Sequence, residues 1–417
     1  MSQAKFPWRR AVGLLLVVAL LGAPHAYAAD EDTPAWFAAR QLMGAQQPSG
    51  QFVFDYDFLL GGGRPGTELD VGRLEYITRE AAAAYGLSRY FLYDRHPDIG
   101  RTLKSFLGNV RELSLPISKA PGQSVLEAIG ILSLPIGRDR IAATLQWLNI
   151  LYHPTGEGRL VSYDRSYETA WGGATALSLL AELQFFHASG DPQFAALRQA
   201  WLQGLLVLYD TGKGFRRLPG SIDENALSNG EIWLALAYYT HLFPDDRVTS
   251  ALVARLDDYM INTYSARPNA GFYSWGTSAA VQRLETTSDT KFRTFIGRIT
   301  RVYLGNTSLL PSAGANSCAA IEGLAAALRV LSSEESPDQN FIVRLRQYVD
   351  SEMDKNLLLQ IRKGQTRVEL GNGAYLYAPS LADHAGAFLA AAQEPYVRID
   401  FTEHCIAALL ELDKVKH

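Results

Sequence analysis

Helical stretches that are apolar on nearly every side recur along this sequence, and they constrain the fold more than any other feature. The clearest is residues 225–241, which begin with small and polar residues and then become apolar through Ile232, Trp233 and Leu236. A helix that is hydrophobic all round must be surrounded by protein. This segment is therefore predicted to be an inner helix whose polar beginning faces something other than core.

The same order of residues, polar first and small or aromatic afterwards, predicts inner helices at 78–94, 166–186, 316–332, 381–392 and 401–412. More amphipathic companions are predicted at 97–113, 191–209, 247–264 and 338–359. Residues 33–45 are expected to form a short amphipathic helix, and the alternating residues 48–58 a short strand. Around Pro135 the sequence fits either a strand or a broken helix, and residues 138–151 are predicted to be helical.

A second mark, a glycine followed closely by aromatic residues, lies between these helices. It occurs at Gly50, Gly158, Gly214, Gly271 and Gly373. From Gly158 to Gly214 is 56 residues and from Gly214 to Gly271 is 57, while the flanking intervals of 108 and 102 are close to twice that period. A turn mark at fixed spacing with helices between is typical of stacked helix pairs. At 271–275 the mark is expected to form an exposed turn.

These periods predict an all-α fold, an α/α toroid, in which inner helices are covered by an outer amphipathic ring. A helix pair with its connections fits in roughly 50 residues, so the chain has room for five or six pairs and the array can close on itself. Residues 29–417 are expected to form this single domain. An open helical solenoid, with a long concave groove in place of a central cleft, is the alternative.

The first residues read as a secretory signal. Lys5, Arg9 and Arg10 precede an apolar stretch at 11–21, and a small-x-small cleavage site ends at Ala28. We expect a periplasmic or secreted protein; the alternative is a retained anchor, although the apolar stretch is short for a membrane span. No later stretch is long and apolar enough to cross a bilayer. Removing residues 1–28 takes away three positive charges, so the formal charge moves from -4 to -7, which gives no reason to bind nucleic acid.

The sequence contains two cysteines, Cys318 and Cys405, and both lie near the start of a predicted inner helix. An exported chain permits a disulfide, but the sequence leaves open whether these two pair. With two cysteines and eight histidines, no zinc-type ligand spacing is present. Motifs for nucleotide, phosphate or dinucleotide binding are also absent, so neither a metal nor a cofactor is expected.

In a closed double ring the beginnings of the inner helices converge on one end, and polar residues there are candidates for a site. Carboxylates can protonate a glycosidic oxygen, activate water or abstract a proton, aromatic rings can stack on sugars, and arginines can pair with a uronate. The catalytic candidates are Glu231, Glu322, His404 and Tyr167. The candidates for substrate binding are Arg79, Glu80, Trp171, Arg216, Trp233, Tyr273, Trp275 and His384.

Each candidate also has a structural explanation. Acids near helix starts, such as Glu168 and Glu403, can complement the helix dipole and cap free amides. Glu231 and Glu322 lie deeper in apolar sequence, so burial without a partner would be costly and each needs either a structural ion pair or a catalytic role. Histidines can pack or cap, and tryptophans and tyrosines are commonly core residues.

Three segments carry a resemblance to known families: residues 228–246, 268–275 and 316–331. They resemble α/α-toroid families that process polysaccharides, in particular the C-terminal helical domain of D-glucuronyl C5-epimerases and, more distantly, the N-acylglucosamine 2-epimerase group. The resemblance implies a toroid that acts on a uronate with tyrosines and glutamates around it. The catalytic positions of the epimerases do not match one by one, so the reaction is not transferred.

Two functional hypotheses follow. The first is an exported enzyme that acts on a polysaccharide or oligosaccharide as a uronyl epimerase, hydrolase or lyase. The second is a non-catalytic protein of the same fold that binds a glycan or an envelope-protein partner during polymer secretion. A terpenoid-cyclase-like toroid is disfavoured because its acid clusters of the DxxDD type are missing.

Overall fold

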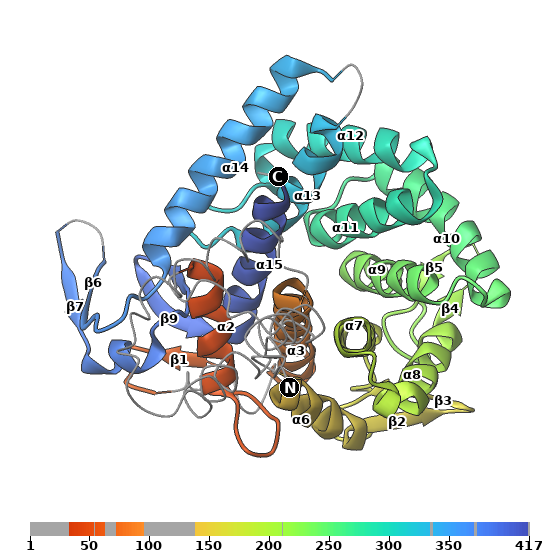
Figure 1. Cartoon of the computed structure of the whole chain (residues 1–417), viewed down its shortest axis with the longest axis horizontal. Helices are drawn as coiled ribbons and strands as arrows, with labels where there is room; N and C mark the ends of the chain where they lie inside the picture. Colours follow the sequence, from red (N-terminus) through yellow and green to blue (C-terminus); the bar gives the residue numbers. More distant parts are fainter. Residues whose placement is uncertain are drawn as a thin grey trace, which may run out of the picture. The chain divides into compact units, whose positions relative to one another are not determined.

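The computed structural model describes residues 33–53, 55–62, 72–95, 138–210, 212–333, 337–370 and 373–415 (Figure 1). The chain divides into two compact units, residues 1–29 with 94–136 and residues 30–93 with 137–417. Asp94 and Arg95 belong to the first unit, and every other described residue belongs to the second. The expected signal segment, the companion helix at 97–113 and the section around Pro135 lie outside the described residues.

Six helices in the described part of the second unit form an inner ring (Figure 1). They are α3 (Gly72–Arg95), α7 (Gly172–Ser189), α9 (Ala226–Leu242), α11 (Ala270–Thr287), α13 (Cys318–Ser332) and α15 (Ile399–Val415). From α7 to α15 each packs on the next. α3 closes the ring, because Phe91 stacks on Phe185 of α7 with ring centroids 6.3 Å apart and Gly86 lies against Glu403 of α15.

Among the described elements, outer helices pack against five of the inner helices. The pairs are α6 (Arg138–Ile150) with α7, α8 (Ala195–Val207) with α7, α10 (Arg247–Ala266) with α9, α12 (Thr290–Gly305) with α11, α14 (Gln339–Leu359) with α13, and α2 (Pro34–Ala45) with α15. Since the inner helices form a closed ring and the outer ones cover it, the predicted α/α toroid is confirmed and the open solenoid is excluded.

Burial explains why the two rings differ in sequence. Every residue of α9 from Ser228 to Thr240 is buried, as expected for a helix that is apolar all round. The outer α12 instead buries one stripe that includes Phe292, Phe295 and Ile299. Side-chain caps fix several helix starts, and the carboxamide of Asn225 accepts a hydrogen bond from the Ser228 amide at the start of α9.

Short strands fill the connections between the helices. β1 (Asp55–Asp57), β9 (Glu394–Arg398) and β8 (Leu389–Ala391) form an antiparallel sheet in the order β1-β9-β8. The remaining strands form the hairpins β2–β3 (Tyr152–Thr155 and Gly158–Val161), β4–β5 (Tyr209–Asp210 and Gly214–Phe215) and β6–β7 (Arg367–Glu369 and Tyr375–Tyr377). Three short 3-10 helices complete the described elements: η1 (Pro192–Phe194), η2 (Thr307–Leu309) and η3 (Pro379–His384). Three of the five glycine marks therefore fall on or next to hairpins.

The structure corrects two predictions about elements. Residues 271–275 are not a turn but lie in the first turns of α11, and all of them except Gly271 are buried, because Asn269 caps a helix there and the small residues that follow fit against α9. Residues 381–392 are not an inner helix. They form the end of η3 and strand β8, because Gly386 adopts a left-handed backbone (φ 99°) that interrupts a helix.

Close helix packing in the inner ring depends on glycines. A Cβ atom on Gly230 of α9 would lie 2.7 Å from Cβ of Trp275 in α11. One on Gly323 of α13 would lie 2.8 Å from Cα of Ser274, also in α11. Both separations are shorter than van der Waals contact, so the spacing of α9, α11 and α13 requires residues without side chains at these two positions.

A disulfide between Cys318 and Cys405 joins α13 to α15, with the two Cα atoms 4.8 Å apart. It settles the pairing that the sequence left open. Among the described residues, no helix is both long enough and apolar enough to cross a membrane.

Replacing Gly230 by alanine is expected to destabilise the protein. Overpacking costs about 1–3 kcal/mol, and the higher helix propensity of alanine offsets at most about 1 kcal/mol of this. Gly44→Ala in α2 is the matched control, because a Cβ there has no neighbour within 4 Å, and it is expected to leave stability unchanged or slightly higher. Urea denaturation midpoints measure both, and equal midpoints for the two variants would contradict the close-packing argument.

Candidate active site

Five titratable side chains lie inside the inner ring, and we call them the central acid cluster: Arg89, Glu231, Glu322, Glu403 and His404. Four of them are joined by direct contacts, and Glu231 interacts electrostatically with His404 and Glu403. Glu322 accepts hydrogen bonds from the guanidinium of Arg89 and, at 3.1 Å, from Nδ1 of His404. The same Nδ1 lies 3.3 Å from Oε2 of Glu403. The cluster therefore joins charges from α3, α13 and α15.

The cluster's acids come from the second turns of inner helices. α9 begins at Ala226 and carries Glu231, α13 begins at Cys318 and carries Glu322, and α15 begins at Ile399 and carries Glu403 and His404. The expectation that inner-helix beginnings share one region thus holds for these residues. Glu403 does not cap its helix, however, because both of its carboxyl oxygens are buried with no hydrogen-bond partner in the described part of the chain.

Arg89 keeps two of its neighbours ionised. Burial alone would raise the pKa of Glu322, but Arg89 and His404 outweigh it and hold that pKa below its ordinary value. Arg89 also donates to Glu411 of α15 at 3.0 Å. Burial opposes ionisation of Glu411 too, and Lys414, Arg89 and Arg329 together lower its pKa to about 2.

The other two acids of the cluster have raised pKa values. Burial raises the pKa of Glu231 to about 8, and its carboxyl lies against Gly173 of α7. Burial and the negative charge of Glu322 likewise raise the pKa of Glu403. Burial would lower the pKa of His404, but Glu403 and Glu322 raise it to about 9. The site thus combines two carboxyls of raised pKa, one carboxyl of lowered pKa and an imidazole of raised pKa.

Glu322, Glu403 and His404 also offer a possible set of metal ligands. Their candidate ligand atoms lie within 4.8 Å of one another. The guanidinium of Arg89 and the protonated imidazole already place two positive charges beside these carboxyls. The sequence-based expectation of no metal stays a prediction.

Aromatic side chains border the cluster. The ring of Trp275 lies 5.5 Å from that of His404 and 6.1 Å from that of Tyr85. Trp171 reaches the same region through Ser228: its indole nitrogen donates to the Ser228 hydroxyl at 3.0 Å, and that hydroxyl neighbours Gly173, where Glu231 also packs. Of the predicted aromatic binding residues, Trp275 thus contacts a cluster residue, and Trp171 is linked to the surroundings of Glu231 through Ser228.

A second polar group lies along α3. Glu80 is buried and accepts a hydrogen bond from the Phe52 amide at 2.9 Å, and burial raises its pKa to about 8. The neighbouring Arg79 forms an ion pair of 3.5 Å with Asp400 at the start of α15. These contacts give Glu80 and Arg79 roles in holding α3 to adjoining segments.

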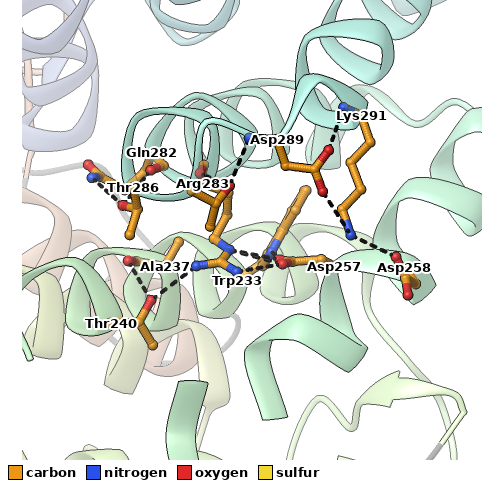
Figure 2. A network of polar contacts seen from close by, with 11 residues as sticks. Trp233, Ala237, Thr240, Asp257, Asp258, Gln282, Arg283, Thr286, Asp289 and Lys291 are labelled. Carbon is orange, nitrogen blue, oxygen red and sulfur yellow. Dashed lines mark hydrogen bonds and ion pairs between the residues drawn. The ribbon is translucent and has the colours of Figure 1, made fainter. Parts of the chain in front are cut away.

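The structure assigns Trp233 and Tyr273 to helix packing and not to a sugar platform. Figure 2 shows Trp233 donating to the carboxylate of Asp257, at 2.8 Å, which also binds Arg283. The Trp233 ring is fully buried and stacks on Phe272. Tyr273 donates to Thr300 at 3.0 Å and stacks closely on another tyrosine of α12.

Three further candidates have their neighbours outside the cluster. Tyr167 is 47% exposed and lies beside His153 of the β2–β3 hairpin. Arg216 pairs with Asp210 of the β4–β5 hairpin at 3.8 Å. His384 packs on Tyr56 and lines a separate cleft of about 480 Å³ between α2, β1, β9 and η3. The structure does not bring these three together with Glu231 and Glu322.

Arg89 and Glu411 are the cluster partners that the sequence did not indicate. The position of Arg89 inside the mostly apolar stretch at 78–94 could have indicated a buried ion pair, because a buried cation needs a carboxylate partner. Its partners Glu322 and Glu411 lie 233 and 322 residues away in sequence, so the sequence alone could not predict which acids pair with it.

Comparison with known proteins identifies the fold class. No protein-family model matches the chain, and no curated protein matches it either. Among solved structures, it is similar to the GH76A α-1,6-mannanase from Salegentibacter sp. HEL1_6 (TM-score 0.55, 11% identity, 92% of this chain and 98% of the other). An inactive variant of that enzyme with two consecutive aspartates replaced, in complex with α-1,6-mannotriose, gives a TM-score of 0.53 at 12% identity, over 92% and 98% of the two chains.

An unsaturated glucuronyl hydrolase specific for heparin is similar to a comparable degree (TM-score 0.54, 9% identity, 92% of this chain and 96% of the other). The chain therefore has the α/α-toroid fold found in these glycoside hydrolases. At such low identity the likeness establishes the fold alone. It confirms the toroid implied by the resemblance of residues 228–246 and 316–331, while the likeness to epimerases stays a prediction.

Replacing Glu231 by glutamine should flatten the dependence of stability on pH. With a folded pKa of about 8 and an ordinary value of 4.5, Glu231 contributes stability below pH 4.5 that is lost as the pH rises through 8. The loss reaches at most about 1.4 kcal/mol per pH unit. Urea midpoints at pH 5, 7 and 9 should therefore fall less for the variant than for the wild type. Glu157→Gln, at an exposed turn, is the control, and profiles for E231Q that run parallel to wild type would refute the assignment.

Proposed function

We propose that this chain is an exported carbohydrate-active enzyme that acts on a polysaccharide, and that the central acid cluster is its active site. The observation that carries the proposal is that a carboxyl of raised pKa, Glu231, and a carboxyl of lowered pKa, Glu322, both interact with His404 in the inner ring of a glycoside-hydrolase-type toroid. The signal-like residues 1–28 support export to the periplasm or beyond.

The protonation states fit glycosidic chemistry. Cleavage of a glycosidic bond requires one carboxyl that donates a proton to the leaving oxygen and another that is ionised to act as base or nucleophile. Glu231 supplies the proton, and Glu322, held ionised by Arg89 and His404, is the negative partner. Glu403, close to both Glu322 and His404, keeps a second proton within the cluster.

A uronate-containing polymer is the substrate class that we favour. The cations Arg89 and His404 give the cluster a positive component that can attract a sugar carboxylate. One solved structure of the same fold is named as a glucuronyl hydrolase. The described inner helices of this chain carry no two adjacent aspartates, unlike the pair whose replacement inactivates the mannanase, so the acids here would act in another arrangement. The same groups would serve a hydrolase, a lyase or a uronyl epimerase, which differ in the bond that breaks.

The second candidate function is a non-catalytic glycan-binding or envelope-assembly protein of the same fold. It is favoured by one observation: the side chains of Glu322 and Glu403 are 0% exposed, and His404 only 17%. In that case the cluster stabilises the contacts between inner helices, and the absence of turnover distinguishes this protein from an enzyme.

Incubation with a panel of uronate polymers and an α-1,6-mannan, with products read by mass spectrometry, tests the enzyme. Glu231→Gln and Glu322→Gln are each expected to reduce turnover by about 10²–10⁴-fold, because each removes a proton donor or a charge from the reacting centre. Glu157→Gln is the matched control. Unfolding midpoints at neutral pH verify that the variants remain folded.

The two roles leave different signatures. Loss of Glu231 should matter less for an activated aryl glycoside, whose leaving group needs no proton, whereas loss of Glu322 should affect both substrate types. Full turnover by both folded variants would refute the active-site assignment. Glycan binding by the wild type without any product would favour the non-catalytic function.

A further inference from the structure

The β6–β7 hairpin presents two tyrosines to solvent on one face. Tyr375 is 46% and Tyr377 is 69% exposed, and the residues paired with them across the hairpin, Glu369 and Arg367, are exposed as well. The alternate residue Leu376 packs on the opposite face, against a small core that contains Val368. The hairpin therefore has an anchored side and a free side.

The geometry of a strand places the two rings side by side. Residues two apart on one strand point to the same face and are separated by roughly 7 Å. A tyrosine ring combines a flat apolar surface with a polar hydroxyl, which suits contact with the face of a sugar and its hydroxyl groups. Folding does not account for this exposure, because Leu376 and Val368 on the other face supply the hairpin's packing.

Positive charge accompanies the two tyrosines. Arg362, Lys363 and Arg367 are all exposed, whereas the acids of the described residues 362–370 and 373–377 consist of Glu369 alone. Three cations and one acid give this segment a charge of +2, in a chain whose formal charge is -4. The guanidinium carbon of Arg367 lies 5.3 Å from the centre of the Tyr375 ring. The exposed face thus pairs aromatic rings with cations.

We propose that the exposed face of this hairpin binds a strand of acidic polysaccharide, at a site separate from the central acid cluster. Tyr375 and Tyr377 would stack on sugar rings, while Arg367 and Lys363 would pair with sugar carboxylates. The choice of ligand rests on the proposed function, which makes an acidic glycan the substrate class. The hairpin extends beyond the end of α14 (Figure 1), so a bound polymer need not enter the ring to be held.

The test measures binding and turnover separately. Tyr375→Ser/Tyr377→Ser is compared with Val248→Ser, which removes an apolar side chain that is 81% exposed on α10. Affinity for a soluble polyuronate and for neutral dextran is measured by affinity electrophoresis at low and high salt. The double variant is expected to lose about tenfold or more in affinity for the polyuronate, and V248S none. Lys363→Gln/Arg367→Gln should weaken binding mainly at low salt, because salt screens exposed charges.

Several outcomes would overturn the proposal. One is that the double tyrosine variant binds the polyuronate as tightly as the wild type does. Another is that the wild type binds dextran and polyuronate equally, or does not bind polyuronate at all. The last is that this face binds another protein but no glycan. Unfolding midpoints and far-UV circular dichroism confirm that each variant is folded.

Turnover of a short oligosaccharide, too short to span both sites, separates this inference from the active-site assignment. If the tyrosine variant loses polymer affinity while Glu231→Gln and Glu322→Gln leave turnover unchanged, the hairpin site stands and the active-site assignment falls. The reverse pattern, with unchanged polymer affinity and loss of turnover in the cluster variants, overturns the hairpin site alone.

Discussion

One buried guanidinium connects three helices of the inner ring. Arg89 of α3 binds Glu322 of α13 and Glu411 of α15, and its side chain is only 9% exposed. Removing one partner from such a pair leaves an uncompensated charge, which typically costs about 3–5 kcal/mol. The position of α3 in the ring and the ionised state of both carboxylates therefore depend on this residue.

The chemistry of the cluster follows from the way that charge is shared. The cations stabilise the negative charge of Glu322. Burial and this charge raise the pKa of the neighbouring Glu403, and burial beside Gly173 raises the pKa of Glu231. Environments that push the pKa values of nearby carboxyls apart are a recognised means of dividing acid and base roles. Tight packing around the glycines is thus linked directly to proton placement.

The sequence predicted the toroid because inner helices that are apolar all round differ from the amphipathic outer ones. It did not predict α11, because the glycine and aromatic residues at the start of this helix resemble a loop when considered alone. It also predicted a helix at 381–392, where the left-handed backbone of Gly386 prevents one. Glu231 and Glu322 were predicted as site candidates because each is surrounded by apolar residues in the sequence. Pairing between distant residues, such as Arg89 with Glu322, depends on tertiary packing, and local patterns do not encode it.

The ring is completed where α3, the first of the described inner helices, meets α15, the last. Contacts that span the whole sequence form slowly, since loop-closure entropy must be overcome before they become favourable. During synthesis from the ribosome, α3 has no partner on one side until α15 emerges. The seam between these two helices should therefore assemble late, and until then the face of α3 that carries Gly86 and Arg89 is open to solvent or to a chaperone.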